Sequence, residues 1–109
     1  MLNSKITIII NTVNSEEQIF GCLDSIKPEY KVIIIENSNN DEFKQNVEKK
    51  YKNVECFLTG KNLGYAKGNN LGLSKVTSKY ALILNPDTTI ESQAIDNFFV
   101  SAEKYENFS

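Results

Sequence analysis

Short apolar runs alternate along the chain with segments in which apolar residues recur at helical spacing. Four runs have the composition and length of buried strands, and they cover residues 5–10, 32–35, 54–58 and 80–84. Helical patterns follow a cap at Asn14 or Ser15, begin again at Asp41, and resume after a loop that starts at Gly60. A last amphipathic pattern runs from about residue 91 to 105. The order βαβαβαβα predicts a three-layer α/β fold, with helices on both faces of a mostly parallel sheet of about four strands.

Composition narrows the function classes. The 109 residues include 12 lysines and 14 acidic residues but no histidine, and the net charge of -2 disfavours nucleic-acid binding. The lack of histidine removes the usual general base and every Ser-His or Cys-His relay. Cys22 and Cys56 lack the spacing of a zinc or redox motif and are expected in the core. No apolar run is long enough to span a bilayer and no signal peptide is recognisable, which predicts a cytoplasmic protein.

Polar residues follow each predicted strand, where the carboxyl ends of a parallel sheet form a ligand-binding crevice. These segments are Asn11–Asn14, Glu36–Ser38, Thr59–Gly64 and Asn85–Thr88. Strand-end loops are polar in any case because they meet water, which accounts for the Ser and Asn residues. It accounts less well for the carboxylates that occur there.

Gly60, Gly64, Gly68 and Gly72 recur every four residues without matching a P-loop or a dinucleotide fingerprint. They indicate a flexible loop that opens a helix, where Lys67 and free N–H groups would suit an anion. The Asn85–Pro86–Asp87 segment offers one carboxylate, enough for Mg²⁺ or Mn²⁺ if phosphates and water complete the shell. The alternative is a turn in which Asp87 caps the following helix.

Taken together, these segments resemble the family-2 glycosyltransferases of the GT-A fold, especially the rhamnosyltransferase-like members. The N-terminal half of that family reads P-T-Y-N after its first strand, V-D-N-S-S at the end of the second, then N-x-G-x-A-x-G-N-N-x-G and L-N-P-D-T. This chain shows Thr12 and Asn14, then Glu36-Asn37-Ser38, then the block from Asn62 to Gly72 and the segment from Leu84 to Thr88. The match covers nearly the whole chain, in order and at the family's spacing.

The resemblance implies a nucleoside-diphosphate sugar lying across the strand ends, with Thr12 and Glu36 at the base and ribose. It implies that Asp87 ligates Mg²⁺ or Mn²⁺ at the diphosphate. The Asn-Pro-Asp-Thr form points to a deoxyhexose donor such as dTDP-rhamnose. The nucleotide-binding set implied by the resemblance is Thr12, Asn14, Glu36, Asn37, Asn62, Gly64, Lys67, Asn70 and Asn85.

The chain departs from the family pattern at several of these positions. Asn11 stands for the family's proline and Val13 for an aromatic residue that can stack on the base. Glu36 replaces the usual Asp, and Asn85 replaces the first acid of the metal motif. Family members continue well past this point with the acceptor site and the catalytic base. We therefore expect a single nucleotide-sugar-binding domain over residues 1–109 that is apparently truncated, with the base absent.

Three functional interpretations follow. The first is a glycosyltransferase donor half, completed by a partner chain or a homo-oligomer, in the cytoplasm or held by partners at the inner face of the membrane. The second is a non-catalytic nucleotide-sugar-binding module or vestigial fragment. The third, a response-regulator-like or flavodoxin-like protein, would need an acidic pocket with a late Lys or a flavin loop after the first strand, and neither is found.

Overall fold

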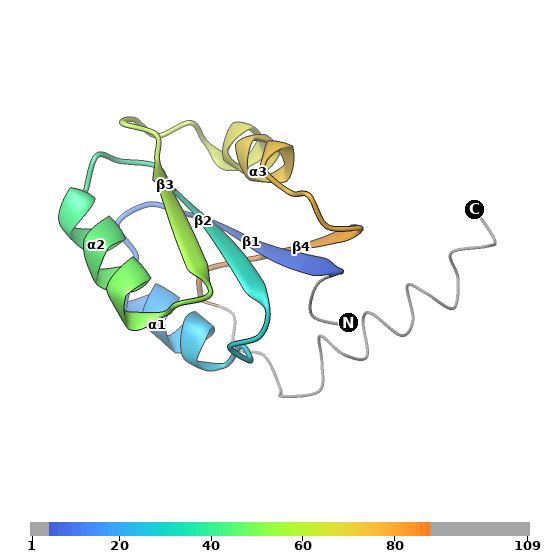
Figure 1. Ribbon diagram of the computed structural model, residues 1–109. Helices are drawn as coiled ribbons and strands as arrows, with labels where there is room; N and C mark the ends of the chain where they lie inside the picture. Colours follow the sequence, from blue (N-terminus) through green and yellow to red (C-terminus); the bar gives the residue numbers. More distant parts are fainter. Residues whose placement is uncertain (1–4, 88–109) are drawn as a thin grey trace.

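The computed structural model describes residues 5–87, so Thr88 and the helix expected near residues 91–105 lie outside the described part. Seven elements alternate along the described chain (Figure 1). They are β1 (Ile6–Thr12), α1 (Glu16–Asp24), β2 (Lys31–Glu36), α2 (Asp41–Lys50), β3 (Val54–Leu58), α3 (Tyr65–Ser74) and β4 (Tyr80–Leu84). All neighbouring strands are parallel, in the order β3-β2-β1-β4. The predicted α/β fold with a parallel sheet is confirmed.

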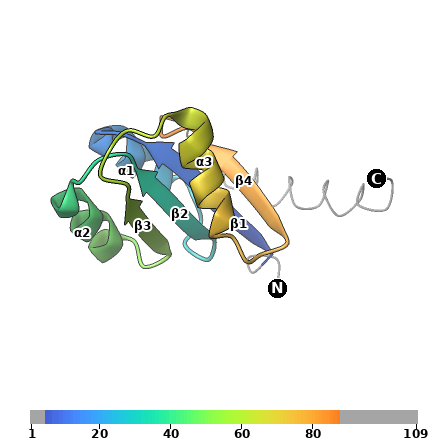
Figure 2. The ribbon, with the colours of Figure 1, turned by 90° about the horizontal axis from the view of Figure 1, so that it is seen from above.

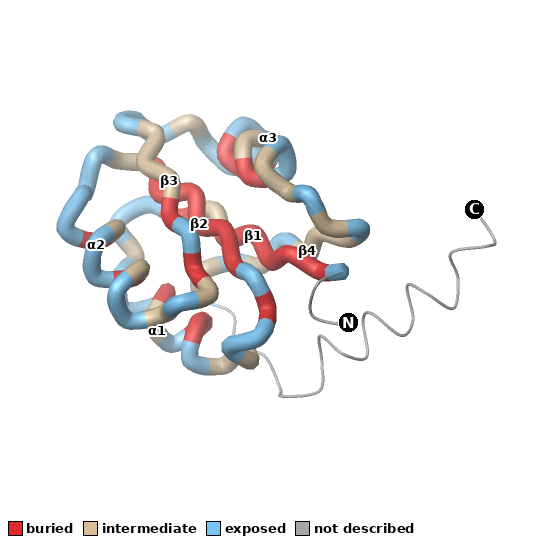
Figure 3. Tube along the Cα trace, viewed as in Figure 1, coloured by how far each residue is buried: buried red, intermediate tan, exposed pale blue. Residues whose placement is uncertain are grey.

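The sheet is covered by helices on both faces. Helices α1 and α2 lie on one face and α3 lies on the other, as two perpendicular views show (Figures 1 and 2). The main core joins alternate residues of the strands to α1 and α2, and it includes Ile8, Ile34, Cys22, Val47 and Cys56. The central strands β1 and β2 are almost completely buried (Figure 3). Both cysteines are free and buried, as their apolar surroundings predicted.

Close packing of α3 on the sheet explains half of the glycine repeat. A Cβ atom at Gly72 would lie 2.6 Å from the Ile9 Cγ2 atom, and one at Gly68 would overlap the side chain of Asn11. Gly60 and Gly64 instead have positive φ angles of +78° and +84°, which L side chains rarely adopt. Helix α3 begins at Tyr65, directly after Gly64. Gly60 and Gly64 therefore allow the backbone conformation of the loop, and Gly68 and Gly72 allow α3 to pack closely on the sheet.

The first strand runs further than its apolar run predicted. β1 extends to Thr12, which pairs with Glu36 in the parallel register. The N–H of Asn37 donates to the Thr12 carbonyl at 2.8 Å and continues the ladder. Asn11 and Thr12 are thus strand residues rather than loop residues, which fixes their side chains beside the end of β2.

No helix within residues 5–87 is long and apolar enough to cross a membrane.

Candidate functional site at the carboxyl ends of the strands

An open cleft of about 300 Å³ lies at the carboxyl ends of β1 and β2. Its lining comes from four polar segments, which the sheet topology brings together. The lining residues are Asn11, Thr12, Val13, Ser15, Asn37, Asn62, Gly64, Tyr65 and Pro86. Four members of the predicted nucleotide-binding set, Thr12, Asn37, Asn62 and Gly64, therefore share one cleft.

Glu36 places a buried carboxylate at the end of β2, beside this cleft. Its side chain is only 1% exposed, and its Oε2 atom accepts hydrogen bonds from the Ser38 hydroxyl at 2.5 Å and from the Asn14 N–H at 3.4 Å. A buried charge is costly unless it is hydrogen-bonded, so these donors are what the site needs to retain it. The contact brings Asn14 to Glu36, and Asn14 itself has a positive φ of 49°.

Thr12 carries a buried hydroxyl for which the described residues offer no partner. The residue is 4% exposed, and its Oγ1 atom makes no hydrogen bond within residues 5–87. Buried polar atoms are nearly always paired in folded proteins, so an orphaned hydroxyl in a cleft is a candidate ligand contact. Thr12 pairs with Glu36 in the strand register, so the two residues lie side by side at the strand ends.

Asn37 and Asn11 tie the ends of β1 and β2 to the start of α3. The Asn37 side-chain amide donates to Asn11 Oδ1 at 2.5 Å and to the Thr12 carbonyl at 2.9 Å. The Asn37 Oδ1 atom accepts from the Leu63 N–H at 3.0 Å. Asn11 Nδ2 in turn donates to the Gly64 carbonyl at 3.3 Å. The sequence predicted Asn37 as a site residue, whereas it placed Asn11 in a candidate strand-end segment and gave it no role beyond its departure from the family's proline.

Lys67 and Asn70 do not line the cleft. Both side chains are exposed on α3, whereas Asn62 accepts from the Gly64 N–H at 2.9 Å in the preceding loop. Asn69, which the sequence analysis did not select, is 5% exposed, and its Oδ1 atom has no partner within the described residues. Gly68, Asn69 and Gly72 lie on the face of α3 that packs on the sheet, whereas Lys67 and Asn70 lie on its exposed face.

The segment after β4 brings Pro86 into the cleft and leaves Asn85 and Asp87 exposed beside it. The Cys22 Sγ atom lies 4.0 Å from the Asn85 carbonyl oxygen. Burial, reinforced by the negative charge of Asp87, raises the pKa of the Cys22 thiol to about 11. The backbone that follows β4 therefore passes close to the last turn of α1.

Asn85 and Asp87 could hold a metal ion only together with ligands from a bound molecule. Within residues 5–87, no group of three or more His, Cys, Asp or Glu side chains could hold one. Asp87 supplies a single exposed carboxylate and Asn85 an amide oxygen. Such a set fits Mg²⁺ or Mn²⁺ only where substrate phosphates and water provide the remaining oxygen ligands.

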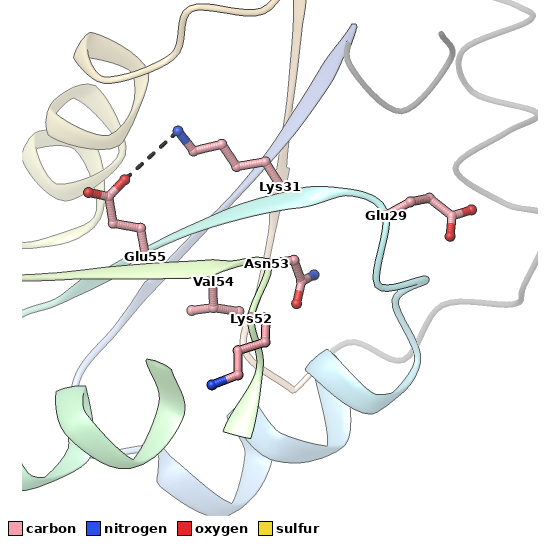
Figure 4. A pocket seen from close by; sticks show the side chains of 6 residues that line it. All are labelled: Glu29, Lys31, Lys52, Asn53, Val54 and Glu55. Atoms are coloured by element: carbon pink, nitrogen blue, oxygen red, sulfur yellow. Dashed lines mark ion pairs between the residues drawn. The ribbon is translucent and has the colours of Figure 1, made fainter. Parts of the chain in front are cut away.

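A second hollow of about 350 Å³ lies at the opposite end of β2 and β3 (Figure 4). It is lined by Glu29, Lys31, Lys52, Asn53, Val54 and Glu55. Lys31 and Glu55 form an ion pair at 3.8 Å across it, and each side chain is about half exposed. Ligands of open parallel sheets bind at the carboxyl ends of the strands, whereas the charged side chains of this hollow are exposed to solvent at the opposite end. The carboxyl-end cleft is the better candidate.

Comparison with known proteins agrees with this fold. The model of glycosyl transferase family 2 matches residues 7–107. A teichoic acid poly(glycerol phosphate) polymerase of Staphylococcus epidermidis is 34% identical over 112 aligned residues, which are 95% of this chain and 15% of the polymerase. S. aureus TarS superposes with a TM-score of 0.79 at 22% identity, covering 94% of this chain and 33% of that one. The mannosyltransferase PcManGT of Pyrobaculum calidifontis, solved with GDP-Man and Mn²⁺, gives a TM-score of 0.72 at 16% identity, covering 93% of this chain and 32% of that one.

The two solved structures share the GT-A-like fold, and the chain spans a third or less of each protein it was compared with. The family model, in contrast, covers nearly the whole sequence, including every position of the predicted site. The chain belongs to glycosyltransferase family 2.

Proposed function

We propose that this chain binds a nucleoside-diphosphate sugar at the carboxyl ends of β1 and β2 and forms the donor-binding part of a glycosyltransferase. The observation that carries the proposal is the buried hydroxyl of Thr12, which no residue in the range 5–87 pairs, next to the buried residue Glu36 at a cleft in a family-2 domain. A nucleoside could provide the hydrogen-bond partner that the Thr12 hydroxyl lacks, because its base and ribose carry both donors and acceptors. Asn14 and Asn37 would keep the pair in place through the hydrogen bonds described above.

The phosphates are proposed to lie toward the exposed charged residues at the edge of the cleft. Asp87, with Asn85, would hold Mg²⁺ or Mn²⁺ there, and Lys67 and Asn70 on α3 would face the same negative charge. A bound cation offsets the charge that develops on a departing nucleoside diphosphate. PcManGT, solved with GDP-Man and Mn²⁺ bound, supports this pairing of metal and donor.

The finer identity of the donor comes from the sequence motif alone. Asn85-Pro86-Asp87-Thr88 favours a rhamnosyltransferase-like enzyme that uses dTDP-rhamnose. Transfer to an acceptor would need a carboxylate base, which a partner chain, a second copy or a further part of a longer protein would supply. The second candidate is a module that binds the nucleotide sugar without catalysis, and it is favoured by a cleft whose described lining residues include no carboxylate.

Thermal unfolding tests the binding proposal. The chain is melted with UDP, dTDP or GDP, each with and without Mn²⁺, alongside Asp87→Ala and the control Glu29→Ala at the opposite end of the sheet. A nucleotide at about 100 times its Kd should stabilise the fold by roughly 2.7 kcal/mol. We expect a Mn²⁺-dependent shift with one nucleotide that Asp87→Ala loses and Glu29→Ala keeps. If no nucleotide shifts the melting temperature of the unsubstituted chain, the proposed function is wrong.

A transfer assay separates the two candidates. The donor selected by unfolding is incubated with the chain, and release of the free nucleoside diphosphate is measured with and without candidate sugar acceptors. Release above the rate seen with Asp87→Ala supports an enzyme. Binding without release shows that this chain does not catalyse transfer by itself and leaves it a binding module unless another chain or segment supplies the base.

A further inference from the structure

Two exposed hydrophobic residues line the cleft, and the nucleotide site proposed above gives them no role. Within residues 5–87, four large hydrophobic side chains are exposed: Val13 at 39%, Tyr65 at 67%, Leu73 at 41% and Ile83 at 38%. Isolated exposed hydrophobic residues are normal on protein surfaces. Two of these four line one cleft, however, and one of the two is aromatic. That coincidence separates Val13 and Tyr65 from Leu73 and Ile83.

The chemistry of the cleft favours an uncharged planar group. None of the described residues that line it carries a charge, and the lining combines amide and hydroxyl groups with Val13, Pro86 and Tyr65. The charged candidates Lys67 and Asp87 lie outside that lining. A diphosphate would find no cation in the cleft, whereas a heteroaromatic ring would find an apolar face and polar groups for its edges.

The backbone that carries Tyr65 is fixed by Asn11. The Asn11 side-chain amide donates to the carbonyl oxygens of both Gly64 and Tyr65 at 3.3 Å. Its Oδ1 atom is held by Asn37, and its side chain occupies the space that a Cβ at Gly68 would need. The first turn of α3 is therefore anchored to the end of β1, which fixes the position of the Tyr65 backbone at the cleft.

We propose that Tyr65 provides the aromatic face on which the base of the nucleotide stacks, with Val13 as a further apolar contact and Asn11 as the positioning residue. The inference rests on the proposed function, because it names the part of the nucleotide that the cleft takes. Stacking tolerates any base, since every base has a π-face. Selection among bases then falls to the polar groups of the cleft.

Calorimetric titration tests this assignment with UDP, dTDP and GDP, each with Mn²⁺, and with Mn²⁺-pyrophosphate, which has phosphates but no base. The variants are Tyr65→Ala, Tyr65→Phe and the control Leu73→Ala, an exposed residue of the same helix that does not line the cleft. Loss of one stacked base costs roughly 5- to 150-fold in affinity. We expect that loss for the nucleotides with Tyr65→Ala alone, near-native binding with Tyr65→Phe and Leu73→Ala, and pyrophosphate binding that no variant changes.

Asn11→Ala tests the positioning role. We expect it to weaken nucleotide binding in the unsubstituted chain and to have little further effect on Tyr65→Ala, because both substitutions would remove the same contact. If Asn11→Ala lowers the nucleotide affinity equally in the unsubstituted chain and in Tyr65→Ala, Asn11 does not act through Tyr65.

The outcomes are distinguishable. If the unsubstituted chain binds a nucleotide and Tyr65→Ala binds it equally well, the stacking assignment is wrong and the proposed function stands. Parallel losses for nucleotide and pyrophosphate would also overturn it, since they would place Tyr65 at the phosphates. If the unsubstituted chain binds none of the three nucleotides, the proposed function fails and this inference fails with it.

Discussion

Helix α2 closes the outer edge of β3 with two charged side chains. β3 is an edge strand of the sheet. The Glu48 carboxylate accepts from the Cys56 N–H at 2.8 Å, and the Lys44 ammonium donates to the Cys56 carbonyl at 2.6 Å. The two side chains also pair with each other at 2.8 Å. They occupy the backbone groups that a further strand would otherwise use, a common way of protecting an exposed sheet edge.

Glu48→Ala should therefore destabilise the chain more than an ordinary surface substitution. A hydrogen bond to a charged group contributes about 1.5–3 kcal/mol, and a partly exposed ion pair four residues apart on a helix adds only about 0.3–0.5 kcal/mol. Both groups are about one-third exposed, so we expect a loss of about 2 kcal/mol, near the lower end of that range. For a domain of this size, that loss lowers the melting temperature by roughly 8 °C or more.

Chemical denaturation and amide hydrogen exchange measure the effect. Glu42→Ala, an exposed acid in the first turn of the same helix, is the matched control. We expect the Cys56 amide to lose protection in Glu48→Ala and to keep it in Glu42→Ala. Removing both Lys44 and Glu48 should also leave the edge open to self-association, seen by sedimentation. Equal stability of Glu48→Ala and Glu42→Ala, with unchanged protection of Cys56, would refute the account.

The pH dependence of the same contact has a defined sign. Burial would raise the pKa of Glu48, but the hydrogen bonds from Cys56 and Lys44 outweigh it, so the pKa lies below its usual value of 4.5. The hydrogen bond to Glu48 raises the pKa of Lys44 above 10.5. A lowered carboxyl pKa stabilises the folded state above the unfolded pKa and loses that effect as the pH falls through the folded pKa. The difference in unfolding free energy between the unsubstituted chain and Glu48→Ala should be constant at neutral pH and should shrink below about pH 4.5.

Two other predictions concern packing and the thiols. Gly72→Ala should cost about 1–3 kcal/mol in denaturation experiments because its Cβ would press on Ile9, which is fully buried. Gly21→Ala, with no neighbouring atom within 4 Å, should instead stabilise the chain by about 0.4–1 kcal/mol, and a loss there would contradict the packing account. Burial raises the pKa of Cys22 to about 11 and that of Cys56 to about 12, so neither thiol should react with a disulfide reagent at neutral pH until the chain unfolds. Rapid modification of the native chain would count against that burial.

The fold was predictable because its signals are local. The strands at residues 54–58 and 80–84 have the predicted bounds, since each apolar run is enclosed by polar or turn-forming residues. The helix from Asp41 follows from its cap, where Asn40 accepts from the Phe43 N–H at 3.1 Å, and from Phe43 and Val47, which are buried one turn apart. Parallel pairing then follows from the alternation of strands and helices.

The site was predictable only as a set of segments. Register determines which residues of a segment meet, and Thr12 reaches Glu36 only because β1 extends past its apolar run. Helical phase separates Asn69, which is buried, from Lys67 and Asn70, which are not. The register has no signal in a single sequence, and the buried residues of α3 are Gly68, Asn69 and Gly72 rather than large apolar side chains that would reveal its phase. The expected residues therefore divide between the cleft and its surroundings.

Asn11 shows how a departure from a family pattern can be compensated. A proline at this position would fix the backbone at the end of β1 but could offer no side-chain hydrogen bond. Asn11 instead accepts from Asn37 and donates to two carbonyls at the start of α3, so the end of β1 is held by contacts with its neighbours. Those contacts require Gly68, because any Cβ there would displace the amide. The Asn11 substitution and the glycine spacing, which seemed unrelated in the sequence, are therefore parts of one arrangement that shapes the cleft.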